Sequence, residues 1–531
     1  MSKAPLFFRL YVKVIEDLHT GTGTGSGDID ALVMRDRRGR PVVPASHLKG
    51  LLREAGDELV DLGLIEQKAL DALLGHDVFN RAKSRSNELR RGALRLRSLR
   101  VKSENGATLI WGSSAREENG RRLAHDTLRY VEYVAAGTEF EAEGLLDEPA
   151  VKSVLETLLG RIDRLGGNRS RGDGLVHLRH DWGRLEERLP PPPNDATCLR
   201  LVLRNLEPLC LPATAHPGNL IPSHSFIRGQ ALRGALMAWA IRRNGVKADL
   251  ARVSVGDALP LPDTIEKAAE LVPIPLSIMT EKPTGGSPDL PWWAQGASQI
   301  MFDGLGKGRD PDKEKPKRPG RHEYLCRHHA KSPWLRYAPE MNVRLRNQTP
   351  KNGSQDEAIL FSLEEIAEDT LFQADVSFDL PSAAEAFWEA FAPLLSGGDW
   401  LAMGRGGQPV RVEGVHWQRL GHRSGTNENG WTLTLTSDLV LRGPMLGFLS
   451  DQFLTGMPTN GEAVDTIAVV AGAYMNGVEV FLPPRQRLSR CRNWLSFAPL
   501  APNVFRIMVG LSGAWPEKSL IRTERVFAQV R

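Results

Sequence analysis

A short segment near the N-terminus combines alternating glycines with three aspartates. Between Leu18 and Asp36 the chain reads LHTGTGTGSGDIDALVMRD. Glycine-rich loops present backbone N–H groups without side-chain obstruction, and they often cradle phosphate groups. A carboxylate beside a bound phosphate can recruit a divalent cation or help to move a proton. The segment therefore predicts a phosphate-binding loop, for either a nucleotide cofactor or a nucleic acid.

The context of this loop argues against a nucleotide cofactor. No Lys-Ser or Lys-Thr pair follows the glycines, and no helix is expected to begin where they end. The chain instead continues through IDALVMRDRRGRP before its first helix. The backbone of a nucleic acid is the better candidate for the phosphates.

Composition describes a globular protein of more than one domain. A chain of 531 residues exceeds one ordinary core, and 41% hydrophobic with 25% charged residues is typical of globular domains. We find no apolar run of membrane-spanning length and no signal-peptide pattern. The four cysteines are far apart with no CxxC pair, so we expect no disulfide framework and a cytoplasmic protein. The net charge of +4 favours a nucleic-acid partner only weakly.

Basic residues are concentrated in two segments. Arg81 to Lys102 holds nine Lys and Arg against one Glu, and its LRLRSLR alternation predicts a strand with guanidinium groups along one face. Such a row suits phosphate contact. Lys307 to Lys331 mixes basic residues with Asp, Glu, Pro and His, and a solvated surface segment explains it equally well.

The chain repeats one plan on either side of a Pro-rich linker, residues 185–197. Each half opens with an alternating strand, LFFRLYVKV or TCLRLVLRN, and continues through an irregular loop to an amphipathic helix. Ser46 and Ser225 are the predicted caps of these helices. Each half then has a strand, an apolar helix and a glycine-rich turn into a last strand. The prediction is an α+β protein with two ferredoxin-like (RRM-like, βαββαβ) domains, 1–184 and 198–531.

The helix of each half also carries a cation beside a glycine near its start. Lys49-Gly50 and Arg233-Gly234 occupy equivalent places in PASHLKG and FIRGQALRG. A cation and exposed amides at a helix N-terminus would act on one anion. An ordinary amphipathic helix accounts for the leucines but not for this recurrence.

Taken together, these motifs resemble the RAMP superfamily of CRISPR-associated proteins. The segment DLHTGTG…GDIDALVMRDRRGRPVVPASHLKGLLRE is similar to the opening of backbone subunits of type III effector complexes, and GNRSRGDGLV to their terminal glycine-rich loop. The second half, through FIRGQALRGALMAWA and AMGRGGQPVRV, resembles the group that caps the 5′ end of the guide RNA. The chain departs from the pattern at Ala45, where the family usually has glycine.

The resemblance implies partners and a reaction. The partners would be guide RNA (crRNA), target RNA and other subunits of the effector complex, and the cofactor a divalent cation such as magnesium. In the backbone subunits, one aspartate of the first glycine-rich loop serves cleavage of target RNA, and Asp30 of the Ile29-Asp30 pair matches it. Asp28 and Asp36 are competitors, although RDRRGRP indicates a structural Asx-turn for Asp36. The second half has no Ile-Asp in its first loop, so we expect it to bind RNA without cutting.

The resemblance and the basic residues together predict an RNA-binding set. Its cationic members are Lys49, Arg53, Arg169 and Arg171 in the first half and Arg228, Arg233 and Arg405 in the second. The glycines of the binding loops are Gly21, Gly23, Gly25, Gly172, Gly404 and Gly406.

An insertion at about residues 280–356 interrupts the second half. It contains Trp292, Trp293, Tyr324, Trp334 and Tyr337 among basic residues, which suits either stacking on unpaired bases or docking of a neighbouring subunit. His322, Cys326, His328 and His329 are of the types that bind zinc, but their spacing does not favour a zinc site. For residues 425–531 we expect only strands that complete the second domain.

Three functions follow from the resemblance. The first is a fused subunit that holds guide RNA and cuts the paired target at Asp30. The second is an architectural RNA-binding subunit. The third is an endoribonuclease that processes guide precursors, with His19, His216 or His224 as acid-base, although His19 is better explained as structural. The doubled architecture and the loop aspartate favour the first.

Overall fold

The structure is a computed structural model. It describes residues 5–75, 91–102, 106–114, 127–183, 191–214, 218–245, 248–265, 268, 270–274, 278–280, 301–303, 322–329, 332, 334–348, 359–418, 433–434, 495–501, 504–509 and 529–530.

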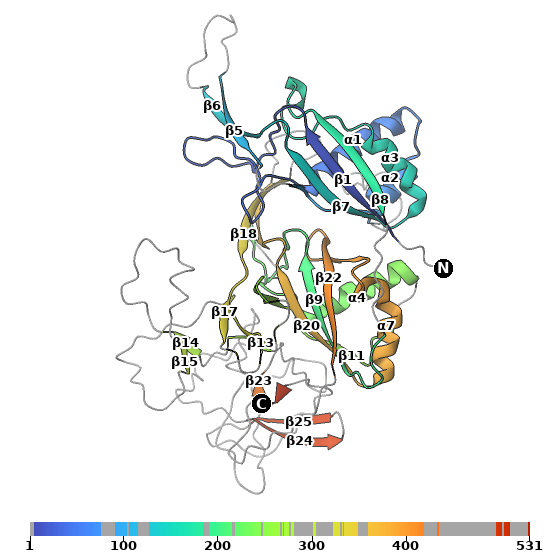
Figure 1. Cartoon of the computed structure of the whole chain (residues 1–531). Helices are drawn as coiled ribbons and strands as arrows, with labels where there is room; N and C mark the ends of the chain where they lie inside the picture. Colours follow the sequence, from blue (N-terminus) through green and yellow to red (C-terminus); the bar gives the residue numbers. More distant parts are fainter. Residues whose placement is uncertain are drawn as a thin grey trace, which may run out of the picture.

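The described chain is α+β, as the sequence predicts, and it contains two sheets that each carry their own helices (Figure 1). We call residues 5–183 the first unit and residues 191–418 the second unit. The first unit contains β1 (Leu6–Val14), β2 (Val42–Val43), α1 (Ala45–Asp61), α2 (Gln67–Leu74), β3 (Leu94–Leu96), β4 (Leu99–Val101), β5 (Thr108–Ser113), β6 (Arg129–Val134), β7 (Glu139–Leu146), α3 (Lys152–Leu159) and β8 (Val176–Gly183). Short 3-10 helices cover Pro149–Val151 and Arg169–Arg171.

The second unit follows the same order with additional strands. It contains β9 (Cys198–Asn205), β10 (Leu220–Ile221), α4 (Gly229–Asn244), β11 (Val253–Val255), β12 (Leu259–Leu261), β13 (Glu270–Pro273), β14 (Ile278–Thr280), β15 (Met301–Asp303), β16 (Tyr324–Arg327), β17 (Leu335–Tyr337), β18 (Met341–Gln348), β19 (Ile359–Ile366), β20 (Leu371–Phe378), α7 (Pro381–Leu395), β21 (Trp400–Met403) and β22 (Gln408–Gln418). Four further strands are β23 (Leu433–Thr434), β24 (Leu495–Ala501), β25 (Val504–Val509) and β26 (Gln529–Val530).

The two main sheets have matching strand orders. The first runs β4-β7-β1-β8 and the second β11-β20-β9-β22, with β2 and β21 added at opposite edges. The opening strand β1 lies between β7 and β8, the opening strand β9 lies between β20 and β22, and each pairs antiparallel with both neighbours. The repeat seen in the sequence is therefore a repeat of topology.

Alternation along the opening strand explains how each core forms. Phe8, Leu10 and Val12 on one face of β1 are almost fully buried against leucines of α1 and α3. In the second unit Leu199, Leu201 and Leu203 of β9 pack in the same way with residues of α4 and α7. Because successive strand residues point to opposite faces, one apolar series covers one helical layer.

The helix caps differ from the prediction. Helix α1 begins at Ala45, whose N–H donates to the hydroxyl of Ser98 at 3.0 Å, and α4 begins at Gly229, whose N–H donates to Asp257 at 2.6 Å. Ser46 lies inside α1, and Ser225 hydrogen-bonds Tyr324 at 2.8 Å. Ser46 and Ser225 were therefore wrong as caps, because the capping groups come from the connections β3–β4 and β11–β12, distant in sequence, and not from the preceding turn.

The arginine row of the LRLRSLR segment lies between the two units and pairs with carboxylates. Arg95 donates through Nε to Asp147 at 3.0 Å and also contacts Asp399 of the second unit. Arg97 donates to Asp369 at 3.2 Å, and Arg100 contacts the same carboxylate. The guanidinium groups that the alternation suggested for phosphate therefore hold the units together.

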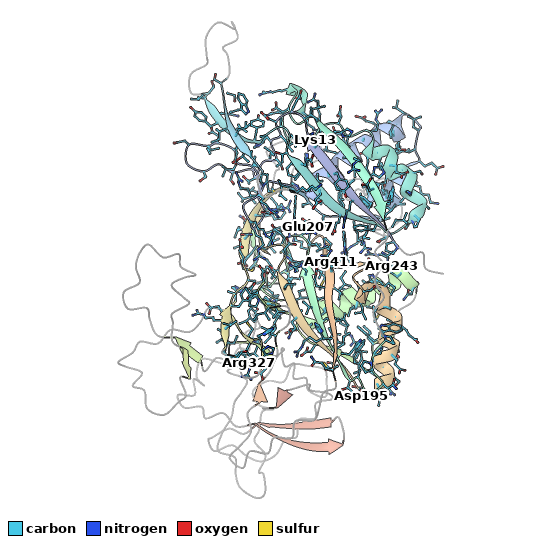
Figure 2. The ribbon with its side chains drawn as sticks, in the orientation of Figure 1. Lys13, Asp195, Glu207, Arg243, Arg327 and Arg411 are labelled. Atoms are coloured by element: carbon cyan, nitrogen blue, oxygen red, sulfur yellow. The ribbon has the colours of Figure 1, made fainter. Side chains whose placement is uncertain are left out.

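Asp399 is the centre of this boundary. Its side chain is 1% exposed, and it accepts hydrogen bonds from Arg243 Nε at 2.6 Å and from the Trp239 indole at 2.9 Å, in addition to its contact with Arg95. Burial acts to raise the pKa of Asp399, but Arg95 and Arg243 lower it overall. Figure 2 shows Arg243, Glu207 and Arg411 in the region between the two sheets.

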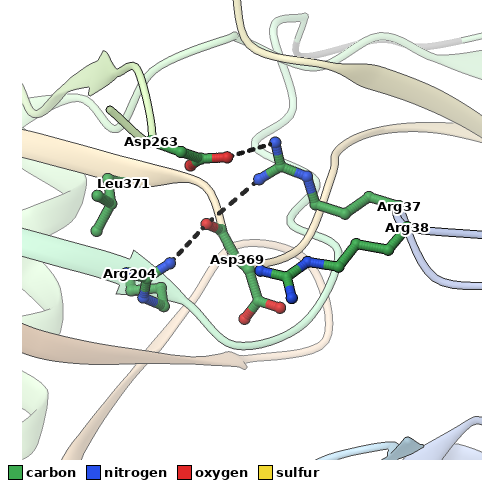
Figure 3. Close-up of a pocket in the computed structure, with 6 residues that line it drawn as sticks. All are labelled: Arg37, Arg38, Arg204, Asp263, Asp369 and Leu371. Carbon is green, nitrogen blue, oxygen red and sulfur yellow. Dashed lines mark hydrogen bonds and ion pairs between the residues drawn. The ribbon is translucent and has the colours of Figure 1, made fainter. Parts of the chain in front are cut away.

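The turn after Asp36 adds a second contact between the units. Arg37 donates to Asp263 at 2.9 Å and to the Asp369 carbonyl at 3.4 Å, while Arg204 donates to the same carbonyl at 3.0 Å (Figure 3). These residues line a cavity of about 190 Å³ together with Arg38 and Leu371. The glycine-rich segment is thus anchored to the second unit at its C-terminal end.

Candidate nucleic-acid interface

The loop that carries Asp30 is pinned to the hairpin β5–β6 at its base. The N–H of Leu18 donates to the Val134 carbonyl at 2.9 Å, and the Leu18 carbonyl accepts the Val134 N–H at 2.8 Å. Gly21 bridges Val33 across the loop. The glycine-rich stretch is therefore an ordered loop whose two sides pair through their backbones.

Asp30 is exposed and held by one oxygen. Its N–H donates to the Tyr130 carbonyl at 2.9 Å, and its Oδ2 accepts the Tyr130 N–H at 2.8 Å. Oδ1 has no hydrogen bond to any residue that the structure describes. A Cβ on Gly25 would lie 2.4 Å from the Ile29 carbonyl oxygen, so only glycine fits beneath this turn. One carboxylate oxygen of this exposed side chain is thus oriented, and the other has no partner among the described residues.

The other two aspartates differ from Asp30. Asp36 is buried, and its Oδ1 accepts the N–H groups of Arg38 and Arg40, each at 2.9 Å. This is the Asx-turn that the sequence predicts, and the interpretation of Asp36 as structural is confirmed. Asp28 is exposed in the tight turn between Ser26 and Ile29.

Glu132 supports the loop, and the sequence analysis did not single it out. Its Oε2 accepts the Val33 N–H at 2.9 Å, and its Oε1 pairs with Arg35 at 2.5 Å. Burial acts to raise the pKa of Glu132, but the bonds from Val33, Thr108 and Arg35 lower it overall. The sequence contains a signal for Glu132, because VEYV of the first half matches LEEI of the second and both have glutamate at the second position.

The last glycine-rich loop of the first unit, which contains Gly166 and Asn168, packs near the base of the loop that carries Asp30. His19 donates through Nδ1 to the Glu132 carbonyl at 2.7 Å, which agrees with a structural role. Asn168 donates to the Tyr133 hydroxyl at 3.2 Å. His47 of α1, a second residue missed from sequence, accepts the Gly166 N–H at 2.8 Å, and burial, followed by Arg169, lowers its pKa.

The predicted cations of the first unit divide into two kinds. Arg53 donates to Asp71 at 3.2 Å and contacts the Gly75 carbonyl, so it joins α1 to α2. Lys49 is half-buried toward the boundary, where burial and then Arg95 lower its pKa. Arg171 is exposed with no ion pair among the described residues, and Arg169 makes only an exposed pair with Glu54 at 3.1 Å.

The second unit shows the same division. Arg233 donates to the carbonyls of Val253 and Leu250 at 2.6 and 2.9 Å and so ties α4 to the following segment. Arg228 is half-buried at the N-cap of α4. Arg405 is exposed, and its guanidinium lies 5.5 Å from the centroid of the Phe361 ring.

The predicted glycines lie in the two kinds of loop. A Cβ on Gly404, at φ +64°, would lie 2.5 Å from the Cys210 carbonyl, as one on Gly166 would lie 2.3 Å from the His19 carbonyl. These two glycines are therefore equivalent. Gly21 packs against His19, while Gly23, Gly172 and Gly406 adopt φ values of +81°, +105° and +86°.

The backbone register identifies the counterpart of Asp30 in the second unit. Glu364 accepts the Ser223 N–H at 2.9 Å, as Glu132 accepts that of Val33, and Pro212 bridges Ser223 as Gly21 bridges Val33. Leu220 lies three residues before Ser223 and pairs with Ser362 beside Glu364, so it stands where Asp30 stands. Leu220 is 48% exposed.

The sequence offers two places for a metal ion: the candidate zinc ligands around Cys326, and Asp30. Among the described residues no group of three His, Cys, Asp or Glu is placed to hold a metal ion. Cys326 is buried in an apolar cluster, and burial raises the pKa of its thiol to about 11. At Asp30 a divalent cation would have one protein carboxylate, which suits Mg²⁺ when phosphates and waters supply the other ligands.

Some predictions fall outside the described residues. These are the aromatic pair Trp292 and Trp293, His216 and most of 425–531. Tyr324, which lies in the described part of the insertion, is buried and shares a hydrogen bond with the Ser225 hydroxyl. The centroid of the Trp334 ring lies 4.6 Å from the Arg327 guanidinium. None of the helices in the part of the chain that the structure describes is long and apolar enough to cross a membrane.

Comparison with known families gives a match to part of the first unit. Residues 11–177 match the RAMP superfamily; this range runs from within β1 to the start of β8 and includes Asp30 and Glu132. No curated protein matches the chain.

Two solved structures are similar to part of the chain. One is the type III-B Cmr-beta complex bound to cognate target RNA, with 14% identity over 33% of this chain and 96% of the other, and a TM-score of 0.27. The other is the apo state of type III-B Cmr-beta, with 15% identity, the same coverage and the same TM-score. A TM-score of this size does not establish a shared fold.

Proposed function

We propose that the chain is a subunit of a type III CRISPR effector complex that binds guide RNA and cuts complementary target RNA at Asp30. Both units would be ferredoxin-like RAMP domains, the first of backbone type and the second related to the group that caps the guide 5′ end. The observation that carries the proposal is the Asp30 carboxylate, exposed on a loop whose backbone is held by Tyr130 and whose base is held by Glu132.

The reaction needs little from the protein besides geometry and one acid. RNA supplies its own nucleophile, the 2′-hydroxyl, which forms a bond to phosphorus as the bond to the 5′-oxygen breaks. Alignment of these three atoms lowers the barrier because it removes the entropy cost of reaching the geometry. Asp30 Oδ1 would either accept the proton of the 2′-hydroxyl or hold the cation described below, with solvent then accepting that proton; in both cases a proton returns to the leaving 5′-oxygen from solvent.

A divalent cation such as magnesium is part of this proposal. Asp30 would hold it with phosphate oxygens and waters, and a bound cation would stabilise the charge that develops on the phosphate. Arg169, Arg171, Arg228, Arg405 and Lys49 would contact the RNA backbone. Arg53 and Arg233 already use their guanidinium groups within the fold, so their effect on RNA would be indirect.

The test compares Asp30→Ala with wild type in the assembled complex, with guide, complementary RNA and magnesium. We expect loss of one cut with unchanged target binding. Asp28→Ala is the matched control, because Asp28 is exposed in the same loop, and it should cut normally. Unaltered cutting by Asp30→Ala would favour a purely architectural RNA-binding subunit. Metal-independent cutting of precursor RNA by the isolated chain would favour a processing endoribonuclease.

A further inference from the structure

A second basic surface lies on the strand pair β18–β19 and adjoins Arg405, the one member of it that is already assigned above. Arg346 lies directly opposite Phe361 in the antiparallel register, and Arg344 lies opposite Leu363. Opposed residues and those two positions apart share one face of a strand pair, so Arg344, Arg346 and Phe361 lie on the same face. Arg405 joins them by stacking on Phe361 at 5.5 Å. We call Arg344, Arg346, Phe361 and Arg405 the arginine face.

The charges of the arginine face are not balanced within it. Among the described residues one carboxylate, Glu365, shares this strand face, and it lies 3.7 Å from Arg344. Arg346 is half-buried, and burial followed by Arg344 lowers its pKa. Holding guanidinium groups partly out of water without full pairing is costly, and an anion at this place would offset that cost.

The location links the surface to the loop of Asp30. Arg344 donates to the sulfur of Met34, in the first unit, at 3.5 Å. Arg405 sits in the glycine turn of the second unit, where its N–H donates to the Cys210 carbonyl at 2.9 Å. The arginine face therefore extends from one glycine-rich loop to the other.

The first unit has no such surface at the matching positions. The register pairs Trp111 with Val131 as it pairs Arg344 with Leu363, so Trp111 corresponds to Arg344, Ser113 to Arg346 and Arg129 to Phe361. The strand pair is thus repeated in the two units, but its charge is not. The arginine face is a property of the second unit alone.

We propose that the arginine face binds the sugar-phosphate backbone of single-stranded RNA and carries it from the first unit to the second. Planar guanidinium groups match the geometry of phosphate oxygens. Stacking on Phe361 orients Arg405 with its N–H groups available. The inference rests on the proposed function but concerns binding and not cutting.

The test measures the affinity of the full chain for a fluorescent oligouridylate at several salt concentrations. For Arg344→Gln with Arg346→Gln we expect at least a tenfold weaker affinity, and a slope of log affinity against log salt that is smaller by about 1.4, since each lost phosphate contact on single strands contributes about 0.7. The pair Arg344→Lys with Arg346→Lys should keep most of the slope. Arg179→Gln is the control, because Arg179 is exposed, pairs with exposed Asp181, lies over the Tyr11 ring of the first unit and is not part of the arginine face.

Unchanged affinity and slope in the Gln pair would overturn the inference. Equal loss of affinity in the Gln and Lys pairs, together with lower thermal stability, would do so as well, because it would assign these arginines to the fold. If cutting at Asp30 persists in the complex while either result is obtained, the proposed function stands without the arginine face.

Discussion

Leu220 of the second unit occupies the position that Asp30 occupies in the first. Three residues after each of them, a backbone N–H donates at 2.9 Å to a glutamate of the neighbouring strand. The pair is Val33 and Glu132 in the first unit, and Ser223 and Glu364 in the second. Each lies beside that strand at the same register, Asp30 against Tyr130 and Leu220 against Ser362. Both units therefore have the supporting glutamate, but the first has an acid, Asp30, where the second has Leu220.

Leu220→Asp is therefore expected to install a second site of cutting. In an Asp30→Ala background, the assembled complex with guide, target RNA and magnesium should regain one cut at a new position. Mapping the product ends on a sequencing gel measures it. The gain would be partial, because the surrounding residues of the second unit differ from those of the first.

Asn219→Asp is the matched control for this gain. It places a carboxylate one residue earlier on the same exposed segment, where the Asn219 carbonyl accepts the Ser362 N–H at 2.7 Å. If neither variant cuts, or both cut equally, the equivalence of Asp30 and Leu220 has no catalytic meaning.

Glu132→Gln should slow cutting at Asp30. The amide retains the shape of the carboxylate but loses its charge, so the bonds to Val33 and Arg35 weaken. Hydrogen bonds to charged groups contribute about 1.5–3 kcal/mol, so we expect a rate at least tenfold lower with target affinity little changed. Single-turnover cutting and a filter-binding assay separate the two effects.

Glu364→Gln provides the comparison within the same chain. It weakens the equivalent support in the second unit, through Ser223, where no acid is present. A matching loss of cutting in Glu364→Gln would mean that both substitutions act through general destabilisation.

Asp399→Asn should destabilise the boundary between the units. The change leaves Arg95 and Arg243 without their shared buried charge, and breaking a buried ion pair costs about 3–5 kcal/mol. We expect a clear fall in the melting temperature and faster proteolysis in the linker at residues 185–197. Asp181→Asn, which removes an exposed pair with Arg179, should change stability by less than about 1 kcal/mol. Equal melting temperatures for the two variants would contradict this role of Asp399.

Stability should fall as the pH drops below the ordinary range of histidine. Burial, followed by Arg228, lowers the pKa of His224 to about 4 from 6.5. The native protein therefore holds His224 neutral where the unfolded chain protonates it, so the contribution is complete above about pH 6.5 and is lost progressively down to about pH 4. The slope is about 1.4 kcal/mol per pH unit for one such group.

Melting temperatures between pH 4.5 and 7.5 test this dependence. His224→Leu should flatten the profile, although His47, whose pKa burial also lowers, adds a change of the same sign. A profile of the same steepness in His224→Leu would show that other groups control the acid response.

The repeated topology was predictable because it depends on local alternation. Leucines at every second position of β9 and apolar residues at every second position of β1 cover a helical layer whichever residues surround them. The Asx-turn at Asp36 was predictable for the same reason, since its partners Arg38 and Arg40 lie within four residues. The match of residues 11–177 to the RAMP superfamily agrees with the resemblance carried by those motifs.

What covers each face was decided only by the tertiary structure. The alternation at Arg95 and Arg97 shows that guanidinium groups share a face, but only the docking of the second unit brings Asp399 and Asp369 to them. The groups that accept the first N–H of α1 and of α4 come, for the same reason, from Ser98 and Asp257, in connections between strands distant in sequence. Sequence alone determined the repeat and its candidate acid, because these follow from residue order. The partners of each charge depend on packing between distant segments, which residue order does not specify.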